Sequence, residues 1–450
     1  MAPDAPAPFA LVARGPLAGS VEVPGDKSIS HRALMLGALA VGRTAIDGLL
    51  EGEDVLATAA ALRAMGATVA RRGPGTWEVE GVGVGGLLQP ETALDMGNSG
   101  TSTRLLMGLA ASHDLLATFV GDASLSRRPM GRVAEPLERM GAEIRMAPGG
   151  RLPLTVRGLA PALPLTWQLP VPSAQVKTAI LLAGLNACGT TSVLEPVPTR
   201  DHGERMLAAF GARITAEPLP DGGRAITVDG PAELRPQALR VPGDPSSAAF
   251  PLVAALLVPG SRVTIRGVGV NPTRDGLFRV LEAMGARLAR SAPREVGGEP
   301  VADLVVEAGP LRATDVPPAL APAMIDEFPI LFVACALAEG RSELRGLEEL
   351  RVKESDRLAV MAEGLRAAGA RVEERADGLV IEGTGGEPLP GGARIDPRLD
   401  HRIAMSFAVL SLACRAPLEV ADSRPIATSF PGFLPLMEAL GAEVVRPAAA

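Results

Sequence analysis

The feature that most constrains the fold of this sequence is a short pattern that occurs six times, in which a helix-like run ends in a turn centred on glycine. Glycine directly after a helix takes up the left-handed conformation at little cost, and β-branched residues such as Thr68-Val69 and Ile144 then favour a strand. The copies lie about 70–85 residues apart, far more than the roughly 20–50 residues of a solenoid repeat. Each repeat is therefore expected to be a small α/β module. The six turns are Met65-Gly66-Ala67, Met140-Gly141-Ala142, Phe210-Gly211-Ala212, Met284-Gly285-Ala286, Ala368-Gly369-Ala370 and Leu440-Gly441-Ala442.

Six repeats in a chain of 450 residues favour two lobes of three repeats each, although length alone suggests about three domains. The tetrapeptide Val-Pro-Gly-Asp occurs at 23–26 and again at 241–244, and Pro-Gly is a turn signal. We interpret these copies as the points where strands cross between lobes. The predicted lobes are a continuous one of residues 24–241 and a discontinuous one of residues 1–23 plus 242–450.

Composition excludes several classes of protein. The apolar runs at 250–258 and 330–338 are too short to span a bilayer, and the first ten residues lack the basic start and apolar core of a signal peptide. Cys188, Cys335 and Cys414 form an odd, unspaced set, which favours a reduced cytoplasmic location and argues against a cysteine-based metal site. A net charge of −7 argues against nucleic acid as the main partner but is compatible with small anionic ligands.

Polar residues gather where the helices of each repeat are expected to begin. Helix N-termini bind phosphate and carboxylate groups through unpaired N–H groups and the helix dipole. Each start taken alone could be an ordinary helix cap. A Lys or Arg at that end opposes the dipole, however, and the whole set therefore points to anionic ligands. The clearest starts are at 24–28, 97–101, 172–175, 199–201, 242–246, 325–327, 353–357 and 399–402.

Five of these segments resemble the 5-enolpyruvylshikimate-3-phosphate synthase family. They are Pro24-Gly25-Asp26-Lys27-Ser28-Ile29-Ser30-His31-Arg32, Gly97-Asn98-Ser99-Gly100-Thr101, Arg127-Arg128-Pro129-Met130-Gly131, the segment 350–357 and Asp400-His401-Arg402. The resemblance runs from about Leu17 to Gly441. The segments 171–177 and 199–202 are similar to the bacterial branch that includes glyphosate-tolerant (class II) enzymes.

The resemblance implies a two-lobed inverse α/β barrel of six βαβαββ repeats, three per lobe, with the active site in the cleft between the lobes. It implies transfer of the enolpyruvyl group of phosphoenolpyruvate to the 5-hydroxyl of shikimate 3-phosphate with release of phosphate, in the pathway to chorismate and the aromatic amino acids. It further implies a cytoplasmic monomer without metal or organic cofactor, and glyphosate as an inhibitor.

Residue roles follow from the same resemblance. Asp326 acts on the 5-hydroxyl, Glu354 donates a proton to the methylene carbon of phosphoenolpyruvate, and Lys27 is an alternative proton carrier. Supporting positions are Asn98, Thr101 and His401. The implied phosphoenolpyruvate binders are Lys27, Gly100, Arg128, Arg357 and Arg402. The implied shikimate 3-phosphate binders are Lys27, Ser28, Arg32, Ser173, Ala174, Gln175, Asp326 and Lys353, to which we add Arg200 at a position where this sequence departs from the family.

The residues alone leave simpler interpretations open for three of these positions. Glu354 and Arg357 could form an exposed i,i+3 pair on a helix, and Asp326 could be a plain helix cap. His401 could be a packed support for Arg402 rather than a proton carrier. A conflict also remains at Glu354. A proton donor at neutral pH needs a raised pKa, which burial would provide, whereas the flanking Lys353 and Arg357 would lower the pKa.

This sequence departs from the better-known members of the family at three places. It has no tyrosine, and Arg200 occupies the matching stretch, where we expect it to contact the phosphate or ring hydroxyls of shikimate 3-phosphate. Thr428 stands where those members carry a lysine before the Phe-Pro near the C-terminus. Gly100 stands where tolerant relatives place alanine, which predicts a sensitive or intermediate response to glyphosate.

Two other functions compete with this one. The related transfer of the same group to UDP-N-acetylglucosamine typically uses a reactive cysteine, and no cysteine here has an activating basic neighbour. A non-catalytic anion-binding protein on the same scaffold would bind without turnover, and the presence of both Asp326 and Glu354 argues against it.

Overall fold

The computed structural model describes residues 7–446, which divide into two compact units. Unit 1 comprises residues 7–24, 242–295 and 300–446, and unit 2 comprises residues 25–241 and 296–299. The chain passes from one unit to the other inside both copies of Val-Pro-Gly-Asp, after Pro24 and after Val241. The four residues Val296–Glu299 group with unit 2, although the chain on both sides of them belongs to unit 1.

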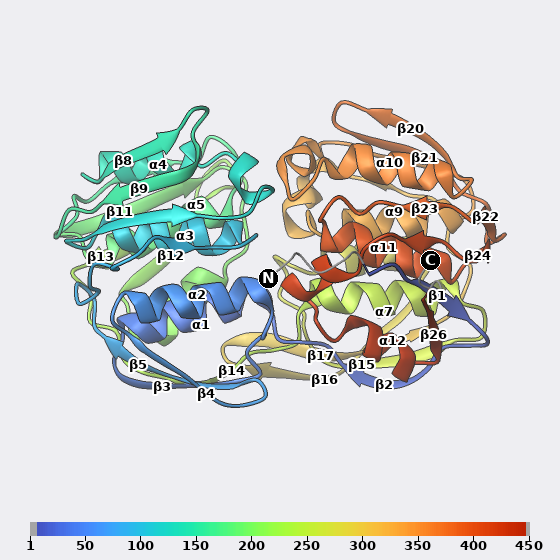
Figure 1. Ribbon diagram of the computed structural model, residues 1–450, viewed down its shortest axis with the longest axis horizontal. Helices are drawn as coiled ribbons and strands as arrows, with labels where there is room; N and C mark the ends of the chain where they lie inside the picture. Colours follow the sequence, from blue (N-terminus) through green and yellow to red (C-terminus); the bar gives the residue numbers. More distant parts are fainter. Residues whose placement is uncertain (1–6, 447–450) are drawn as a thin grey trace. The chain divides into compact units, whose positions relative to one another are not determined.

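Unit 2 contains three repeats, each with two helices and a four-stranded mixed sheet (Figure 1). The strand orders are β14-β3-β5-β4, β6-β7-β9-β8 and β10-β11-β13-β12. Within each sheet the first pair is parallel and the remaining pairs are antiparallel. The helices are α1 (Lys27–Leu39), α2 (Glu53–Ala64), α3 (Gly100–Ala111), α4 (Gly131–Arg139), α5 (Ala174–Gly184) and α6 (His202–Ala209). The strands are β3 (Val41–Asp47), β4 (Thr68–Gly73), β5 (Thr76–Val82), β6 (Leu94–Asp95), β7 (Leu116–Val120), β8 (Glu143–Ala147), β9 (Arg151–Arg157), β10 (Thr166–Gln168), β11 (Gly189–Glu195), β12 (Ile214–Pro218), β13 (Arg224–Gly230) and β14 (Ala238–Arg240).

Unit 1 contains the other three repeats, and two of them have sheets of the same kind, β16-β17-β15-β2 and β18-β19-β21-β20. The sixth repeat has short strand pairs instead, β22-β24, β23-β25 and β1-β26. The helices are α7 (Pro245–Leu257), α8 (Gly276–Ala283), α9 (Phe328–Leu337), α10 (Arg357–Ala367), α11 (His401–Ser411) and α12 (Phe433–Ala439). The strands are β1 (Ala10–Ala13), β2 (Ala18–Glu22), β15 (Arg262–Gly269), β16 (Arg287–Val296), β17 (Glu299–Glu307), β18 (Asp315–Val316), β19 (Arg341–Leu344), β20 (Arg371–Arg375), β21 (Gly378–Glu382), β22 (Leu389–Gly391), β23 (Arg394–Ile395), β24 (Cys414–Ala416), β25 (Glu419–Val420) and β26 (Ala442–Val445). Short 3-10 turns lie at Leu125–Arg127 in unit 2 and at Pro318–Ala323, Glu348–Val352 and Arg424–Thr428 in unit 1.

The order of strands explains why the chain crosses between the units. Strand β2 directly precedes α1 of unit 2 but pairs with β15 of unit 1, and β14 precedes α7 of unit 1 but pairs with β3 of unit 2. Each crossing strand thus completes the sheet of the unit that it leaves.

The six glycine turns predicted from the sequence are confirmed. Gly66, Gly141, Gly211, Gly285, Gly369 and Gly441 all follow the second helix of a repeat, with φ between +89° and +102°. This region of backbone conformation is disfavoured for residues with a Cβ atom. The repeats are therefore the α/β modules that the sequence predicted.

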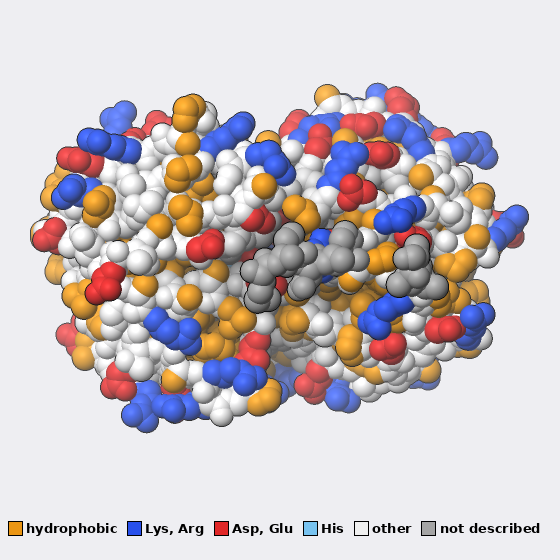
Figure 2. Space-filling view, viewed as in Figure 1, with side chains coloured by type: hydrophobic (Ala, Val, Ile, Leu, Met, Phe, Trp, Pro, Cys, Tyr) orange, Lys and Arg blue, Asp and Glu red, His pale blue; other side chains and the backbone are white. Residues whose placement is uncertain are grey.

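The first helix of every repeat is buried on nearly all sides. In unit 2, α3 and α5 pack together and α1 packs on α2 and α6, while in unit 1 α7, α9 and α11 pack on one another. Their composition fits this position, because α7 and α9 carry the longest apolar runs of the sequence. No helix in residues 7–446 is both long enough and apolar enough to cross a membrane. On the face drawn in Figure 2, basic and acidic side chains are interspersed over each unit rather than gathered by sign.

Candidate functional site

The predicted polar helix starts lie at real helix N-termini in unit 2. Asp26, Ser99 and Ser173 are the N-caps of α1, α3 and α5, and their side chains accept hydrogen bonds from the backbone N–H groups of the first turn. The first helical residues are Lys27, Gly100 and Ala174. The cap interpretation is therefore confirmed for these three residues, and it does not exclude anion binding by the residues that follow them at the helix N-termini.

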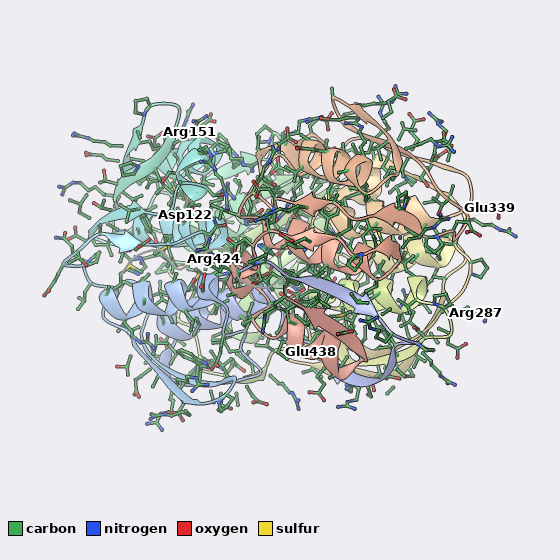
Figure 3. The ribbon with its side chains drawn as sticks, turned by 45° about the vertical axis from the view of Figure 1, so that its right-hand side comes forward. Asp122, Arg151, Arg287, Glu339, Arg424 and Glu438 are labelled. Atoms are coloured by element: carbon green, nitrogen blue, oxygen red, sulfur yellow. The ribbon has the colours of Figure 1, made fainter. Side chains whose placement is uncertain are left out.

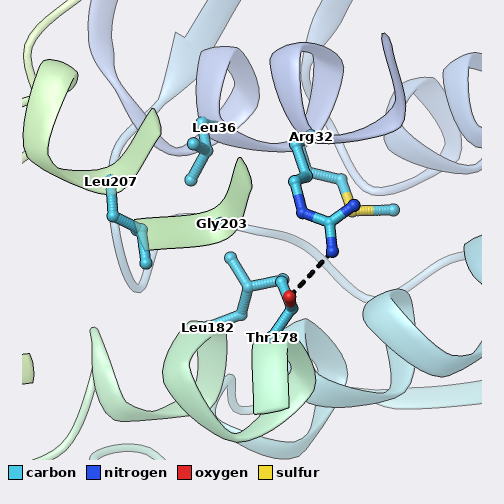
Figure 4. A pocket seen from close by; sticks show the side chains of 7 residues that line it. Arg32, Leu36, Thr178, Leu182, Gly203 and Leu207 are labelled. Carbon is cyan, nitrogen blue, oxygen red and sulfur yellow. Dashed lines mark hydrogen bonds between the residues drawn. The ribbon is translucent and has the colours of Figure 1, made fainter. Parts of the chain in front are cut away.

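The N-terminal half of α1 carries two predicted binders. Lys27 forms an ion pair with Asp54 of α2, and both side chains are largely buried. Arg32 lies one turn further on and donates to the Ser28 carbonyl at 3.0 Å and to the Thr178 hydroxyl of α5 at 2.8 Å (Figure 4). Arg32 thereby joins α1 to α5. A small pocket beside it is lined by Arg32, Met35, Leu36, Thr178, Leu182, Gly203 and Leu207.

The start of α3 brings Asn98 and Arg128 together. The guanidinium of Arg128 donates to the Asn98 carbonyl at 3.1 Å, to the Asn98 side-chain oxygen at 2.6 Å and to the Ser124 hydroxyl at 3.1 Å. The Asn98 amide in turn donates to Asp122, labelled in Figure 3, at 2.7 Å. Asn98 thus orients the guanidinium of Arg128, and its supporting role in the site stays a prediction.

A second arginine, which the sequence reasoning missed, lies at the same helix start. Arg104 donates to the side-chain oxygen of Gln175 at 2.6 Å, and the Gln175 amide donates to Thr101 at 2.9 Å. A Cβ atom at Gly100 would lie 3.2 Å from the Nη1 atoms of both Arg104 and Arg128. Gly100 therefore has two guanidinium groups directly over it. Position 104 lies four residues after Gly100, one helical turn along α3, and that spacing could have revealed it.

Arg200 lies in the segment 196–201 that joins β11 to α6 and is half-buried. Asp201 occupies the N-cap position of α6 without a side-chain cap hydrogen bond. The predicted residues of unit 2 therefore come from the starts of four helices and from the segment before α4.

In unit 1, the predicted catalytic residues meet at one guanidinium group. Arg357 is 1% exposed and donates to Glu354 at 2.6 Å, to Asp326 at 3.4 Å and to Asp400 at 2.8 and 3.3 Å. Burial alone would lower the pKa of Arg357, but the carboxylates of Asp400 and Glu354 raise it above its ordinary value. Arg357 is therefore a permanent cation that holds two carboxylates of predicted catalytic function.

Two simpler interpretations of these residues are wrong. Arg357 is the first residue of α10 and is buried, while Glu354 precedes the helix, so the two do not form an exposed i,i+3 pair on a helix. Asp326 is not a helix cap, because the N-cap of α9 is Glu327 and it makes no side-chain cap hydrogen bond. Asp400, the N-cap of α11 that binds Arg357, was noticed in the sequence as part of a helix start and of a family motif but was given no role in the site.

Arg402 lies one residue into α11 and is held from two sides. Its backbone N–H donates to Asp400 at 3.0 Å, and its guanidinium donates to the Asp326 carbonyl at 2.9 Å and lies 3.5 Å from Glu327. Glu327 is 2% exposed and accepts a short hydrogen bond from Ser246 of α7. Ser246 and Glu327 are further positions that the sequence analysis did not assign to the site.

Three more positions complete this part of unit 1. Burial lowers the pKa of Lys353, opposed in part by the Asp326 carboxylate, and its ammonium lies 3.7 Å from Glu349. His401 is 3% exposed, and its Nδ1 lies 3.2 Å from the Thr428 hydroxyl, which also donates to the Pro425 carbonyl at 2.8 Å. His401 is therefore packed and hydrogen-bonded, while its support of Arg402 stays a prediction. Arg424, labelled in Figure 3, is bound to Asp422 at 2.6 Å.

One group of side chains has the composition of a metal site. Ligand atoms of Asp201, His202 and Glu299, all in unit 2, lie within 4.8 Å of one another. His202 Nδ1 and Glu299 Oε1 are hydrogen-bonded at 2.7 Å, and Asp201 forms an ion pair with Arg205 at 3.0 Å. Contacts within the protein account for this grouping, and we assign no metal to it.

All three cysteines are free thiols. Burial raises the pKa of Cys335 and of Cys414 to about 12, so neither forms a thiolate near neutral pH. Cys188 is exposed. The expectation that no cysteine is activated as a nucleophile is thereby supported for Cys335 and Cys414.

Comparison with known proteins identifies the family. A model of the family described as EPSP synthase (3-phosphoshikimate 1-carboxyvinyltransferase) matches residues 12–437. The chain is 65% identical over 437 residues to the 3-phosphoshikimate 1-carboxyvinyltransferase of Sphingopyxis alaskensis, which covers 96% of this chain and 98% of the relative. It is 64% identical over 434 residues to the protein of the same name from Novosphingobium aromaticivorans, with the same coverage.

Solved structures agree with this result. The EPSP synthase of Acinetobacter baumannii superimposes with a TM-score of 0.85 at 44% identity and covers 98% of this chain and 100% of its own. The enolpyruvyl transferase NikO of Streptomyces tendae has a TM-score of 0.76 at 20% identity and therefore shares the fold alone. The fold is thus the inverse α/β barrel type that the sequence predicted. The chain belongs to the EPSP synthase family, the 3-phosphoshikimate 1-carboxyvinyltransferases.

Proposed function

We propose that the residues gathered around Arg357 in unit 1 and around the starts of α1, α3 and α5 in unit 2 carry out the reaction of this family. That reaction transfers the enolpyruvyl group of phosphoenolpyruvate to the 5-hydroxyl of shikimate 3-phosphate and releases phosphate. The observation that carries the proposal is the Arg357 guanidinium, which holds both Asp326 and Glu354. A reaction that needs an acid and a base near one another finds both groups there.

The addition step needs two proton movements. The 5-hydroxyl oxygen bonds to the central carbon of phosphoenolpyruvate and loses its proton, while the methylene carbon gains one. We propose that Asp326 accepts the proton of the 5-hydroxyl and that Glu354 donates the proton to the methylene carbon, with Lys27 as the alternative proton carrier. In the elimination step the methyl carbon returns its proton and the C–O bond to phosphate breaks, so the roles of acid and base reverse.

The contact between Arg357 and Glu354 bears on this assignment. A guanidinium at 2.6 Å favours the carboxylate form of Glu354, which cannot donate a proton. Phosphoenolpyruvate offers Arg357 a carboxylate of its own. A substrate that draws Arg357 away would leave Glu354 free to take up the proton that the addition step requires.

We assign phosphoenolpyruvate to Lys27, Gly100, Arg128, Arg357 and Arg402, which supply four cations for its phosphate and carboxylate. The support is that the guanidinium groups of Arg128, Arg357 and Arg402 each make at least two contacts with neighbouring oxygens, so that these planar groups are already oriented. Gly100 contributes a backbone N–H at the start of α3, and its lack of a Cβ atom lets the guanidinium groups of Arg104 and Arg128 lie over it.

We assign shikimate 3-phosphate to the start of α5 and the basic groups beside it. Ser173 and Ala174 present N–H groups at the N-terminus of α5, and Arg32 is tied to the same helix through Thr178. Arg200 stands in for the tyrosine that this chain lacks. The assigned set is Lys27, Ser28, Arg32, Ser173, Ala174, Gln175, Arg200, Asp326 and Lys353.

The response to glyphosate is the finer part of the proposal. The chain is similar to the class II branch in its segments 171–177 and 199–202, yet it carries glycine at position 100. A methyl group there would press on Arg104 and Arg128, and glycine avoids this contact. We therefore propose a class II enzyme whose sensitivity to glyphosate is ordinary or intermediate. We further propose that it works as a cytoplasmic monomer without metal or organic cofactor.

The direct test is release of phosphate by the purified protein with both substrates and with each omitted. Release that requires both, with the enolpyruvyl product identified by mass, supports the proposal. Tight binding of shikimate 3-phosphate without release would leave a binding protein on the same scaffold. Activity with UDP-N-acetylglucosamine in place of shikimate 3-phosphate would favour the alternative transferase.

A further inference from the structure

A buried cluster of charged side chains in unit 2 joins two stretches that are assigned to shikimate 3-phosphate. Lys177 of α5 places its ammonium 3.0 Å from Glu195, the last residue of β11, and 2.6 Å from Glu204 in the first turn of α6. The side chains of Lys177 and Glu195 are 0% and 1% exposed, and that of Glu204 is 10% exposed. The hydroxyl of Thr199 donates a short hydrogen bond to Glu195.

These contacts enclose the segment that carries Arg200. Glu195 and Glu204 lie just before and just after residues 196–201, so one ammonium holds both ends of that segment. Thr199, directly before Arg200, is tied to the same cluster through Glu195. At the other side, the backbone N–H of Lys177 donates to the Ser173 carbonyl at 3.1 Å, within the first turn of α5. The cluster therefore links the Arg200 segment to the helix start at Ser173.

Overall stability is a poor explanation for such a cluster. Removing three charges from water is costly, and well-packed apolar residues of similar size are often at least as stabilising as a buried ion pair. Two carboxylates face one ammonium, and Glu204 Oε2 is buried without a hydrogen-bond partner among the described residues. What an ion cluster supplies instead is a fixed geometry, because the ammonium has only a few directions in which to donate.

We propose that Lys177, Glu195, Glu204 and Thr199 are positioning residues for shikimate 3-phosphate, which hold Arg200 at a fixed place relative to the Ser173 end of α5. Arg200 and the N-terminus of α5 would then meet the ligand with little ordering cost at binding, since the protein has already fixed the loop. The inference rests on the proposed function, specifically on Arg200 as a contact of the substrate.

The test uses Thr199→Val in the full-length enzyme, because it removes one hydroxyl and leaves the three charges in place. The matched control is Thr191→Val in β11, where a buried hydroxyl has no hydrogen-bond partner among the described residues. We expect Thr199→Val to weaken shikimate 3-phosphate binding about tenfold in calorimetry, with little change in the KM for phosphoenolpyruvate, and Thr191→Val to bind as the parent does. Wild-type affinity in Thr199→Val would overturn the proposal.

A double-mutant cycle then asks whether the effect passes through Arg200. If it does, Thr199→Val should add less than about twofold to the loss caused by Arg200→Ala, whereas independent effects would multiply. Glu204→Gln, which keeps an oxygen that can accept from Lys177, serves as a second variant with the same expectation. The proposal would be overturned if the losses of shikimate 3-phosphate affinity in the two single variants multiplied in the double variant.

The outcomes separate this inference from the proposed function. A parent protein that releases no phosphate would refute the function itself. An active parent in which Arg200→Ala binds shikimate 3-phosphate normally would refute the role of Arg200, and with it this inference, while leaving the activity established.

Discussion

The guanidinium of Arg357 donates a hydrogen bond to Oε2 of Glu354 at 2.6 Å, so that the cation which we assign to phosphoenolpyruvate also holds the residue we assign as proton donor. Glu354→Gln keeps the size of the side chain and removes its ability to exchange a proton. We expect the kcat to fall about 10²–10⁴-fold, the usual contribution of a general acid or base, while calorimetry finds little change in binding of shikimate 3-phosphate.

The matched control is Glu363→Gln, an exposed glutamate on the same helix α10, which should leave both quantities unchanged. Asp326→Asn should resemble Glu354→Gln in turnover. Parallel losses of turnover and of shikimate 3-phosphate binding in either variant would mean that the residue binds substrate and does not transfer a proton.

Much of this arrangement could be predicted from the sequence because it depends on local rules. Each glycine turn ends one helix and each capping residue begins another, so six repeats and the helix starts follow from short segments. The resemblance of whole motifs then supplied the roles of Lys27, Asp326 and Glu354. What local rules could not supply is which distant side chains meet.

The pairs that sequence reasoning missed all lie far apart in the chain. Lys27 meets Asp54, Arg104 meets Gln175 and Arg357 meets Asp400, across 27, 71 and 43 residues respectively. No periodicity or turn signal encodes such contacts, since they arise only when helices that are distant in the sequence pack together. The same limit applies to Glu354 and Arg357. Their spacing suggested an exposed helical pair, but Arg357 is buried because it also contacts Asp326 and Asp400.

Glycine at position 100 is expected to set the response to glyphosate. In Gly100→Ala the new methyl group would lie 3.2 Å from Nη1 of both Arg104 and Arg128, so these groups must shift by a few tenths of an ångström. We expect the inhibition constant for glyphosate to rise at least about tenfold and the KM for phosphoenolpyruvate to rise less, because one well-placed methyl group discriminates by roughly 10–200-fold.

Gly131→Ala is a suitable control for that substitution. It adds a methyl group at the first residue of α4, three residues after Arg128, where nothing lies within 4 Å of the new atom. The inhibition constant should match that of the parent. A parent enzyme already as resistant as Gly100→Ala would contradict the proposed role of glycine.

The cysteines predict a simple pattern of chemical modification. Burial raises the pKa of Cys335 and of Cys414 to about 12, whereas Cys188 is exposed. Iodoacetamide at pH 7.5 should therefore alkylate Cys188 first, as read by mass spectrometry, because the thiolate is the reacting form. Phosphate release should persist after this modification and in Cys188→Ser. Loss of activity in both would instead indicate a catalytic cysteine, as in the UDP-sugar transferase alternative.

The stability of unit 2 should depend on pH through His31, which is fully buried in α1 and hydrogen-bonded through Nδ1 to Thr58 at 2.8 Å. Burial lowers its pKa well below the ordinary value, the charges of Lys27 and Arg32 lower it further, and Asp26 opposes them only in part. The folded protein therefore keeps His31 neutral at pH values where the unfolded chain, with a pKa of about 6.5, takes up a proton. The unfolded state binds more protons, so the free energy of unfolding must fall as the pH drops below about 6.5, by up to about 1.4 kcal/mol per pH unit for this one residue.

Urea unfolding between pH 5 and 8 should show this slope of the unfolding free energy against pH in the parent and a shallower slope in His31→Asn. The residual slope in that variant is expected to come in part from His113, whose pKa burial also lowers. Identical slopes in parent and variant would show that His31 takes up its proton equally in the folded and unfolded states.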